Sequence, residues 1–167
     1  MRRPAAAAVS VAFFALAPGV VAGFIPWYLT GGWARNEPGN GWVLAALGGA
    51  LIVGGVSVLV HAFARYVIEG RGTPAPPAPT EQLVVGGLNR YVRNPMYVAV
   101  IATILGQALF LARPVLLVYA AAAFATMAAF TRWYEEPMLA QQFGSRYEAY
   151  CNEVPRWLPR VRGRSRN

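Results

Sequence analysis

Four long apolar blocks constrain the fold of this chain more than any other feature. They cover residues 5–29, 42–64, 96–112 and 114–130. A helix needs about 20 apolar residues to cross the ~30 Å of hydrocarbon in a bilayer, so each block approaches one membrane span, although the third and fourth need their flanks. The composition agrees, since 56% of the 167 residues are hydrophobic and 13% are charged. We therefore predict an all-α integral membrane bundle of four transmembrane helices.

The connection between the third and fourth blocks is very short. Arg113 and Pro114 are almost all that separates them. Two membrane helices joined by one turn must run antiparallel, so we predict a tight helical hairpin here. The start of the third helix and the end of the fourth then become neighbours.

The arginines are distributed unevenly along the chain. All fifteen basic residues are arginines, and the formal net charge is +8. Thirteen precede the first block, lie between the second and third, or follow the fourth; only Arg35 and Arg113 lie in the other connections. This positive-inside pattern predicts a multi-pass protein of a plasma (bacterial inner) membrane, with both termini and the 65–95 connection in the cytoplasm. Arginines beside apolar blocks indicate contact with anionic membrane lipids and not with nucleic acid.

The first block also has features of a secretory signal peptide. Two arginines at 2–3 precede an apolar stretch that reaches Ala-Leu-Ala at 15–17. The apolar run continues well beyond that point, so we favour a retained membrane helix, kinked at Pro18, Gly19 and Pro26. Detection of residues 1–17 in purified protein would decide between the two.

The remaining features of the N-terminal half indicate close helix packing and not a catalytic or metal site. Ala46, Ala50 and Gly54 recur every fourth residue and predict a stripe for close helix packing. His61, the only histidine, has no nearby metal-ligating partners, so we assign it a structural role and predict no metal site. We divide the chain into two N-terminal helices (1–69), a proline-rich linker or lid (70–80) and a region carrying the chemistry (81–167).

The segment after the fourth block predicts an amphipathic cytoplasmic tail. Its apolar residues recur at spacings of three and four, and the pattern breaks at Gly144. Ser145 and Glu148 match a capping box, which predicts a new helix that ends before Pro155. The tail is too polar to span a bilayer, so we expect it to lie at the interface and cover the cytoplasmic helix ends.

Two polar clusters flank the predicted hairpin. One comprises Arg90, Arg93 and Asn94, where Asn94 is a favourable helix cap and Pro95 suits a first helical turn. The other comprises Arg132, Glu135 and Glu136. Adjacent carboxylates at the negatively charged inner leaflet need cations. Those cations are either arginines, in a structural ion-pair network, or a bound cationic ligand.

Several motifs in this half resemble a family of membrane enzymes. The segments GGLNRYVRNPMYVAV, EEPMLAQQFG, RYEAY and VPRWLP, in this order around an apolar hairpin, are similar to those of isoprenylcysteine carboxyl methyltransferases and phospholipid methyltransferases. The similarity covers about residues 81–159. It implies S-adenosylmethionine as methyl donor, bound on the cytoplasmic side, and a lipophilic acceptor that arrives from the bilayer.

The resemblance also implies roles for individual residues. Arg132 would lie close to the acceptor, and we take Arg132 and Arg93 as the candidate catalytic residues, both being candidate cationic partners of the two glutamates. The donor would be bound by three groups of residues: Glu81, Gln82, Leu83 and Val84; Asn94, Pro95, Met96 and Tyr97; and Glu135 with Glu136. Asn94 stands where carboxyl-methylating members usually have histidine, and Asn89 stands where the family commonly has tyrosine, whereas the tail resembles carboxyl methyltransferases. The acceptor therefore stays open between a prenylcysteine-like carboxylate and a lipid headgroup.

Two other functions are compatible with parts of the sequence. Sterol-reductase-type membrane enzymes have a similar C-terminal half but use NADPH, and this chain is short and has no evident second phosphate-binding cluster. A non-catalytic four-helix scaffold would use the small-residue stripe to bind partners. Titration with the nicotinamide cofactor distinguishes a reductase from a methyltransferase. Ligand affinity measured in Glu135 and Asn94 variants distinguishes a methyltransferase from a scaffold, because replacing these residues in a scaffold would change stability or assembly but no ligand affinity.

Overall fold

The computed structural model describes residues 16–36, 41–69 and 82–159, and all regular structure in these ranges is helical. The first helix runs from Leu16 to Thr30 and contains a π-helical turn, η1 (Val20–Phe24), and α2 (Ile25–Thr30). The remaining elements are α3 (Gly41–Glu69), η2 (Gly87–Arg90), α4 (Pro95–Phe110), α5 (Val115–Phe130), η3 (Thr131–Glu135), α6 (Glu136–Phe143) and α7 (Ser145–Glu153). The all-α prediction is confirmed for these residues.

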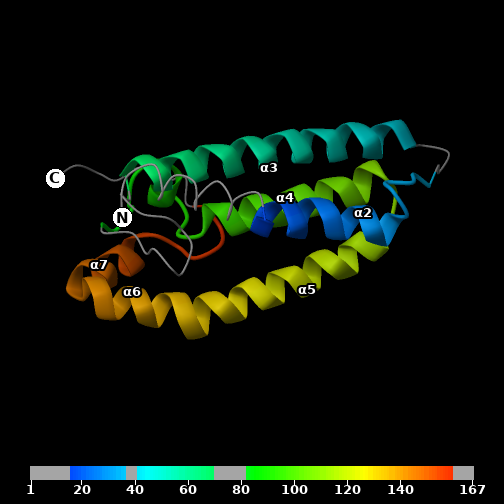
Figure 1. Cartoon of the computed structure of the whole chain (residues 1–167). Coiled ribbons are helices and arrows are strands. Elements are labelled where there is room, and N and C mark those ends of the chain that lie inside the picture. Colours follow the sequence, from blue (N-terminus) through cyan, green and yellow to red (C-terminus); the bar gives the residue numbers. More distant parts are fainter. Residues whose placement is uncertain (1–15, 37–40, 70–81, 160–167) are drawn as a thin grey trace.

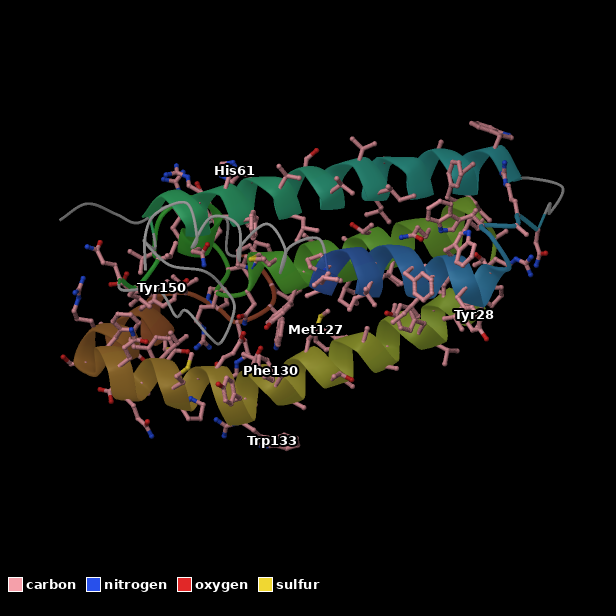
Figure 2. The ribbon with its side chains drawn as sticks, in the orientation of Figure 1. Tyr28, His61, Met127, Phe130, Trp133 and Tyr150 are labelled. Carbon is pink, nitrogen blue, oxygen red and sulfur yellow. The ribbon has the colours of Figure 1, made fainter. Side chains whose placement is uncertain are left out.

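The long helices lie side by side and alternate in direction (Figure 1). The α4 helix contacts both α3 and α5, and the first helix packs against α4 and α5. A buried apolar cluster joins these elements; it comprises Leu59, Ala99, Val100, Ile104, Ala108, Leu111, Leu116 and Ala120. His61 on α3 and Trp133 on η3 project away from the bundle on opposite sides (Figure 2).

Within the described ranges, two helices are long and apolar enough to cross a membrane. They are Gly41–Arg65 and Val115–Phe143. The first helix, Leu16–Thr30, and α4, Pro95–Phe110, are apolar but shorter. The blocks predicted from the sequence therefore correspond to helices, with different bounds and with two clear candidates for membrane spans. The linker 70–80 and the N-terminal residues 1–15 lie outside the described residues.

The predicted hairpin between α4 and α5 is present. Only residues 111–114 separate the two helices, and Ala112 adopts a positive φ of 51°. The Arg113 amide donates to the Ala108 carbonyl at 3.0 Å, and the Arg113 Nε donates to the Ala34 carbonyl at 2.8 Å. The first bond satisfies a carbonyl at the end of α4, and the second ties the turn to the segment after α2, so the chain reverses within four residues.

The fourth helix does not end at Phe130, as the apolar block suggested. It continues through η3 and α6 to Phe143, so Glu135 and Glu136 lie within one long helix and not in a separate tail. The predicted break at Gly144 is confirmed, with φ +52° at that residue. The predicted capping box is wrong, because Gly144 itself occupies the N-cap of α7, and no side chain caps that helix.

Both π-helical turns have the same local cause. The turn η1 ends two residues before Pro26, and η3 ends two residues before Pro137. Proline has no N–H for the i→i−4 bond, and its ring crowds the carbonyl of residue i−4, so the preceding turn widens. In both cases the helix continues past the proline.

The small-residue stripe was predicted on the wrong face of α3. Ala46, Ala50 and Gly54 are exposed. The close contact with α4 is made instead by Gly48 and Gly55, and on α4 by Gly106. A Cβ on Gly48 would lie 2.5 Å from the Gly106 carbonyl oxygen, so only glycine permits this approach.

Candidate functional site

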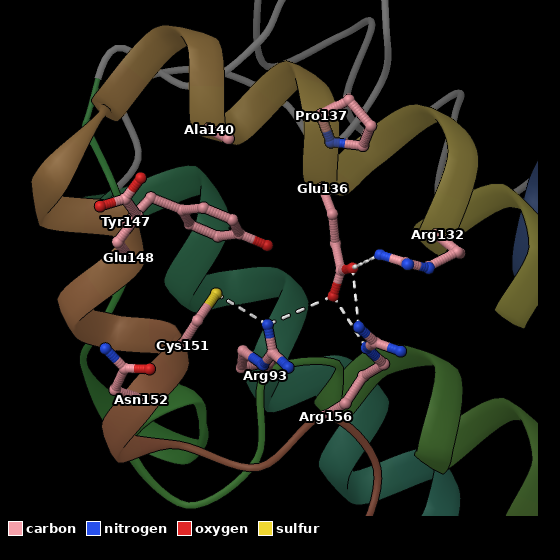
Figure 3. A pocket seen from close by; sticks show the side chains of 10 residues that line it. All are labelled: Arg93, Arg132, Glu136, Pro137, Ala140, Tyr147, Glu148, Cys151, Asn152 and Arg156. Atoms are coloured by element: carbon pink, nitrogen blue, oxygen red, sulfur yellow. Dashed lines mark hydrogen bonds and ion pairs between the residues drawn. The ribbon is translucent and has the colours of Figure 1, made fainter.

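The hairpin brings the two predicted polar clusters together, at the end of the bundle that carries α6 and α7 (Figure 3). We call this region the polar junction; it comprises Arg93, Asn94, Tyr97, Thr131, Arg132, Glu135, Glu136, Cys151 and Arg156. The residues come from the start of α4, from η3 and α6, and from α7 and the segment that follows it. The predicted neighbourhood is therefore confirmed for Arg93, which contacts Glu136, but not for Arg90, which is exposed and lies over the Tyr91 ring.

Glu136 is surrounded by arginines. Its carboxylate accepts two hydrogen bonds from Arg156, one from Nε and one from Nη2, each 2.8 Å long. Arg93 Nη1 donates to Oε1 at 3.2 Å, and Arg132 Nη1 lies 4.0 Å from Oε2. The Glu136 side chain is only 13% exposed. Bidentate, charge-assisted contacts of this kind fix both partners, so Glu136 acts as the anchor of the junction.

Glu135 has a different set of partners. Tyr97 donates its hydroxyl hydrogen to Oε1 at 2.5 Å, and Thr131 donates to Oε2 at 3.0 Å. Among the residues that the structure describes, no arginine lies within ion-pair distance of this carboxylate. The side chain is half-buried. A carboxylate in this position is oriented by hydroxyl groups, but its charge is not compensated by a neighbouring side chain.

Arg93 is held almost completely inside the junction. Its side chain is 14% exposed, and Nη1 also donates to the Cys151 sulfur at 2.7 Å. The buried Nε has no hydrogen-bond partner in the described part of the chain. Arg132, in contrast, has a side chain that is 67% exposed. The two arginines that were predicted to act together thus have unequal access to a ligand.

Asn94 does not cap α4 with its side chain, although it occupies the N-cap position. Its Nδ2 instead donates to the Arg156 carbonyl at 3.2 Å, because the segment after α7 passes beside it. Pro95 is buried in the first turn, as predicted. Met96 packs at the edge of the apolar cluster. The capping prediction for Asn94 is therefore wrong, while its position at the helix start is confirmed.

The residues before η2 are less closely tied to the junction. Glu81 lies outside the described residues, Gln82 is exposed, Leu83 is half-buried and Val84 is buried. No hydrogen bond or ion pair joins 82–84 to either glutamate in the described structure. Their predicted role at the donor stays a prediction.

A cavity of about 470 Å³ opens on the Glu136 side of the junction. Figure 3 shows Arg93 between Cys151 and Glu136, with Arg132 at the outer edge. Burial raises the pKa of the Tyr147 phenol, which lines the same cavity, and its hydrogen bond with Cys151 acts in the same direction. Tyr147 is therefore a neutral hydroxyl group at physiological pH.

Sequence reasoning missed several members of the junction. Arg156 and Trp157 were noticed only as part of the motif VPRWLP, because nothing in the sequence shows where the segment after α7 runs. Thr131 was missed although it precedes Glu135 by four residues, a spacing that places two helical side chains on one face. Cys151 was not among the predicted site residues, but its sulfur accepts a hydrogen bond from Arg93.

Comparison with known proteins identifies the family of the chain. No curated protein sequence matches the chain. A family model described as "Phospholipid methyltransferase" matches residues 41–146, which is more than half of the 167 residues. The match begins at α3, earlier than the motifs indicated, and ends before the VPRWLP segment. With the order of helices and the facing polar clusters, this match shows that the chain belongs to the phospholipid methyltransferase family.

Proposed function

We propose that this protein is an integral membrane enzyme that transfers a methyl group from S-adenosylmethionine to a lipophilic acceptor. Glu135 carries the proposal. Its carboxylate is half-buried and oriented by two hydroxyl groups, yet it has no arginine partner among the described residues, while the adjacent Glu136 contacts three. The donor has a sulfonium and an ammonium group, and either cation would compensate Glu135 more strongly where water is excluded.

The membrane arrangement follows from helix length and charge. At 1.5 Å per residue, the first helix and α4 are about 22 to 24 Å long, so they need their flanking residues to cross a bilayer. Among the described arginines, most belong to the elements at the end that carries the polar junction, where they would face anionic lipid headgroups, whereas Arg35 and Arg113 belong to the connections at the other end. We therefore propose four spans, with the junction and both termini on the cytoplasmic side and α7 at the interface.

The donor site would be built from the start of α4 and from η3. Tyr97 and Glu135 form its polar wall, and Asn94, Pro95 and Met96 shape the adjacent helix start. An aromatic ring such as that of Tyr97 can also contact a cation or stack on adenine. Glu136 takes a supporting role here, because its carboxylate is already bonded to arginines. The segment 81–84 remains a candidate for further contacts to the donor.

Alignment is the chief task of the protein in this chemistry. The donor supplies a methyl group activated by its attachment to a positively charged sulfur. The chain contributes orientation: Tyr97 and Thr131 fix the two oxygens of Glu135, and the ion pairs of Glu136 hold the elements of the site together. Holding two reactants in line contributes up to about 7 to 11 kcal/mol to such reactions.

Arg132 is the arginine best placed to contact an acceptor. It is exposed beside the junction, whereas Arg93 is enclosed by Glu136 and Cys151. A carboxylate acceptor is ionised at neutral pH and needs a cationic partner of this type. An amine acceptor would have to be neutral before methyl transfer. We therefore assign Arg132 to the acceptor side and give Arg93 a positioning role.

The proposal is tested by transfer of a radiolabelled methyl group from the donor. Purified protein in vesicles is given total membrane lipid or prenylcysteine analogues, and the labelled product is identified by chromatography. We expect label in one of these classes, a large loss with Glu135→Gln, and full activity with Glu153→Gln, which removes an exposed carboxylate on α7. Folded protein that neither binds the donor nor transfers label would refute the proposal.

A further inference from the structure

The segment that follows α7 turns back across the polar junction. We call Val154–Pro159 the C-terminal strap; in Figure 1 it runs from α7 toward the beginning of α4. The Arg93 amide donates to the Pro155 carbonyl at 2.9 Å, and Asn94 donates to the carbonyl of Arg156. The Arg156 side chain is bonded to Glu136. The strap is thus fastened to α4 and to α6 on both sides of the site.

These bonds place Trp157 between two helices of the hairpin. Its ring centroid lies 6.5 Å from that of Tyr97 on α4 and 5.0 Å from that of Phe124 on α5. The contact with Phe124 is edge-to-face, an arrangement that aromatic pairs favour. Phe124 precedes Glu135 by eleven residues, so it lies about 16 Å from it along the helix axis, toward the apolar middle of the bundle. Trp157 therefore lies against the apolar side of the Tyr97–Glu135 pair.

A lipophilic acceptor has to approach this pair from the apolar side of the helices. Its head must reach the polar junction while its chain stays beside α4 and α5, and Trp157 occupies the boundary between these two regions. We infer that Trp157 is a specificity-determining residue, which forms the acceptor-side wall of the site and limits how bulky the apolar part next to the acceptor head can be. This inference rests on the proposed function.

The position of Trp157 depends on the strap and not on α4 or α5 themselves. Arg156 and Trp157 are consecutive, so the bidentate bond of Arg156 to Glu136 fixes the backbone from which the indole extends. Glu136 thus acts on the acceptor through Arg156 and Trp157, while Glu135 acts on the donor. Arg156, which positions the wall, and Trp157, which forms it, both lie beyond the matched range of the family model.

The inference predicts a change in acceptor preference and not a loss of donor binding. Two acceptor pairs with constant heads serve as probes: phosphatidylethanolamine with its single-chain lyso form, and N-acetyl-S-farnesylcysteine with its unbranched S-dodecyl analogue, which lacks the methyl branch next to the head. For the pair that the wild type methylates, we expect Trp157→Ala to shift the ratio of kcat/KM toward the bulkier member by about tenfold, mainly through KM. Trp157→Phe should restore most of the wild-type ratio.

Two controls keep the outcome clear. Trp133→Ala removes an indole that is 79% exposed at the same end of the bundle, and it should leave the ratio unchanged. Calorimetry with S-adenosylhomocysteine should give an affinity for Trp157→Ala within about twofold of wild type. If Trp157→Ala does not fold, Trp157→Leu replaces it in the same assay.

The results separate the inference from the proposed function. An unchanged kcat/KM ratio, an equal shift with Trp133→Ala, or a loss of donor affinity that parallels the shift overturns the inference, while methyl transfer by the wild type still supports the function. A wild-type protein that methylates neither pair and does not bind S-adenosylhomocysteine contradicts the proposed function, and the inference fails with it.

Discussion

The α4 helix contacts two of its neighbours, α3 and the fourth helix, in opposite ways. Against α3 it packs backbone to backbone: a Cβ on Gly106 would lie 2.8 Å from the Gly48 carbonyl oxygen and 2.9 Å from the Ile52 nitrogen. Against the η3 end of the fourth helix it is joined by side chains, through Tyr97 to Glu135 and through Arg93 to Glu136. We call the first contact, between Gly48 and Ile52 of α3 and Gly106 of α4, the α3–α4 seam. The second contact is the polar junction.

This difference separates scaffold from site. Backbone contact across the α3–α4 seam leaves no space for a ligand and fixes the position of α4. The polar junction is held by long side chains and by the C-terminal strap. Single side-chain contacts in it can therefore be replaced by contacts with a ligand. Within the junction the same contrast recurs on a smaller scale, because Glu136 is bonded to arginines and Glu135 is not.

The largest effect is expected from breaking the seam. In Gly48→Leu the new side chain would meet the backbone of Gly106 and Phe110, the latter at 2.5 Å from its nitrogen. Overpacking typically costs about 1 to 3 kcal/mol, and it costs more here because backbone atoms cannot rotate away. We expect little monodisperse protein in size-exclusion chromatography. Gly54→Leu adds the same side chain to the same helix where a Cβ meets nothing within 4 Å, and it should behave like wild type. Equal behaviour of the two variants would contradict the packing described for α3.

The next effect is expected from removing the anchor of the junction. Glu136→Gln leaves the enclosed Arg93 and the strap residue Arg156 without a carboxylate, and breaking a buried ion pair costs about 3 to 5 kcal/mol. The midpoint of thermal unfolding in detergent should fall by roughly 10 °C. Glu153→Gln is the matched control, since Glu153 is exposed. A midpoint equal to that of the control would mean that the arginines do not fasten the junction.

A smaller effect is expected at the Glu135 side. Tyr97→Phe removes one hydroxyl that orients this carboxylate, and a hydrogen bond to a charged group contributes about 1.5 kcal/mol or more, so donor affinity should fall about tenfold. Thermal unfolding should change little, because the ring is retained. Tyr134→Phe, at an exposed position of the helix that carries Glu135, should leave both unchanged. A large drop in the thermal midpoint without loss of donor affinity would mean that Tyr97 stabilises the fold and does not contribute to donor binding.

The smallest effect is expected at the edge of the junction. Arg132 lies 4.0 Å from Glu136 and is 67% exposed, and surface ion pairs of this type contribute less than about 1 kcal/mol. Arg132→Gln should therefore shift the thermal midpoint no more than Arg146→Gln, which removes an exposed arginine from α7. Differential scanning calorimetry of the two variants makes the comparison. A drop similar to that of Glu136→Gln would show that Arg132 is part of the anchor and not available to an acceptor.

Much of this fold was accessible from the sequence. Apolar blocks gave the long helices, and the short connection at Arg113 and Pro114 gave the hairpin, which in turn placed Asn94 and Glu135 at the same end. These inferences succeeded because hydrophobicity and connection length act locally. The wrong register of the α3 stripe has a different origin: glycine and alanine occur on more than one face of this helix, and only the position of α4 decides which face is packed.

The division of roles between the two glutamates was not accessible from the sequence. Glu135 and Glu136 are adjacent and chemically identical, and their environments differ because a π-helical turn before Pro137 and the path of the strap direct them to different partners. Arg156 lies twenty residues beyond Glu136, after a left-handed turn at Gly144. The partners that a side chain contacts cannot be inferred from residue spacing alone when they depend on such turns.

Donor binding by Glu135→Gln tests the central claim most directly. Isothermal titration with S-adenosylmethionine, in detergent micelles without acceptor, compares this variant with wild type and with Glu153→Gln. Loss of a carboxylate facing a cation predicts about 30- to 100-fold weaker binding, or roughly 2 to 3 kcal/mol, with an unchanged thermal midpoint. Wild-type affinity in Glu135→Gln, or an equal loss in Glu153→Gln, would contradict the assignment of Glu135 to the donor.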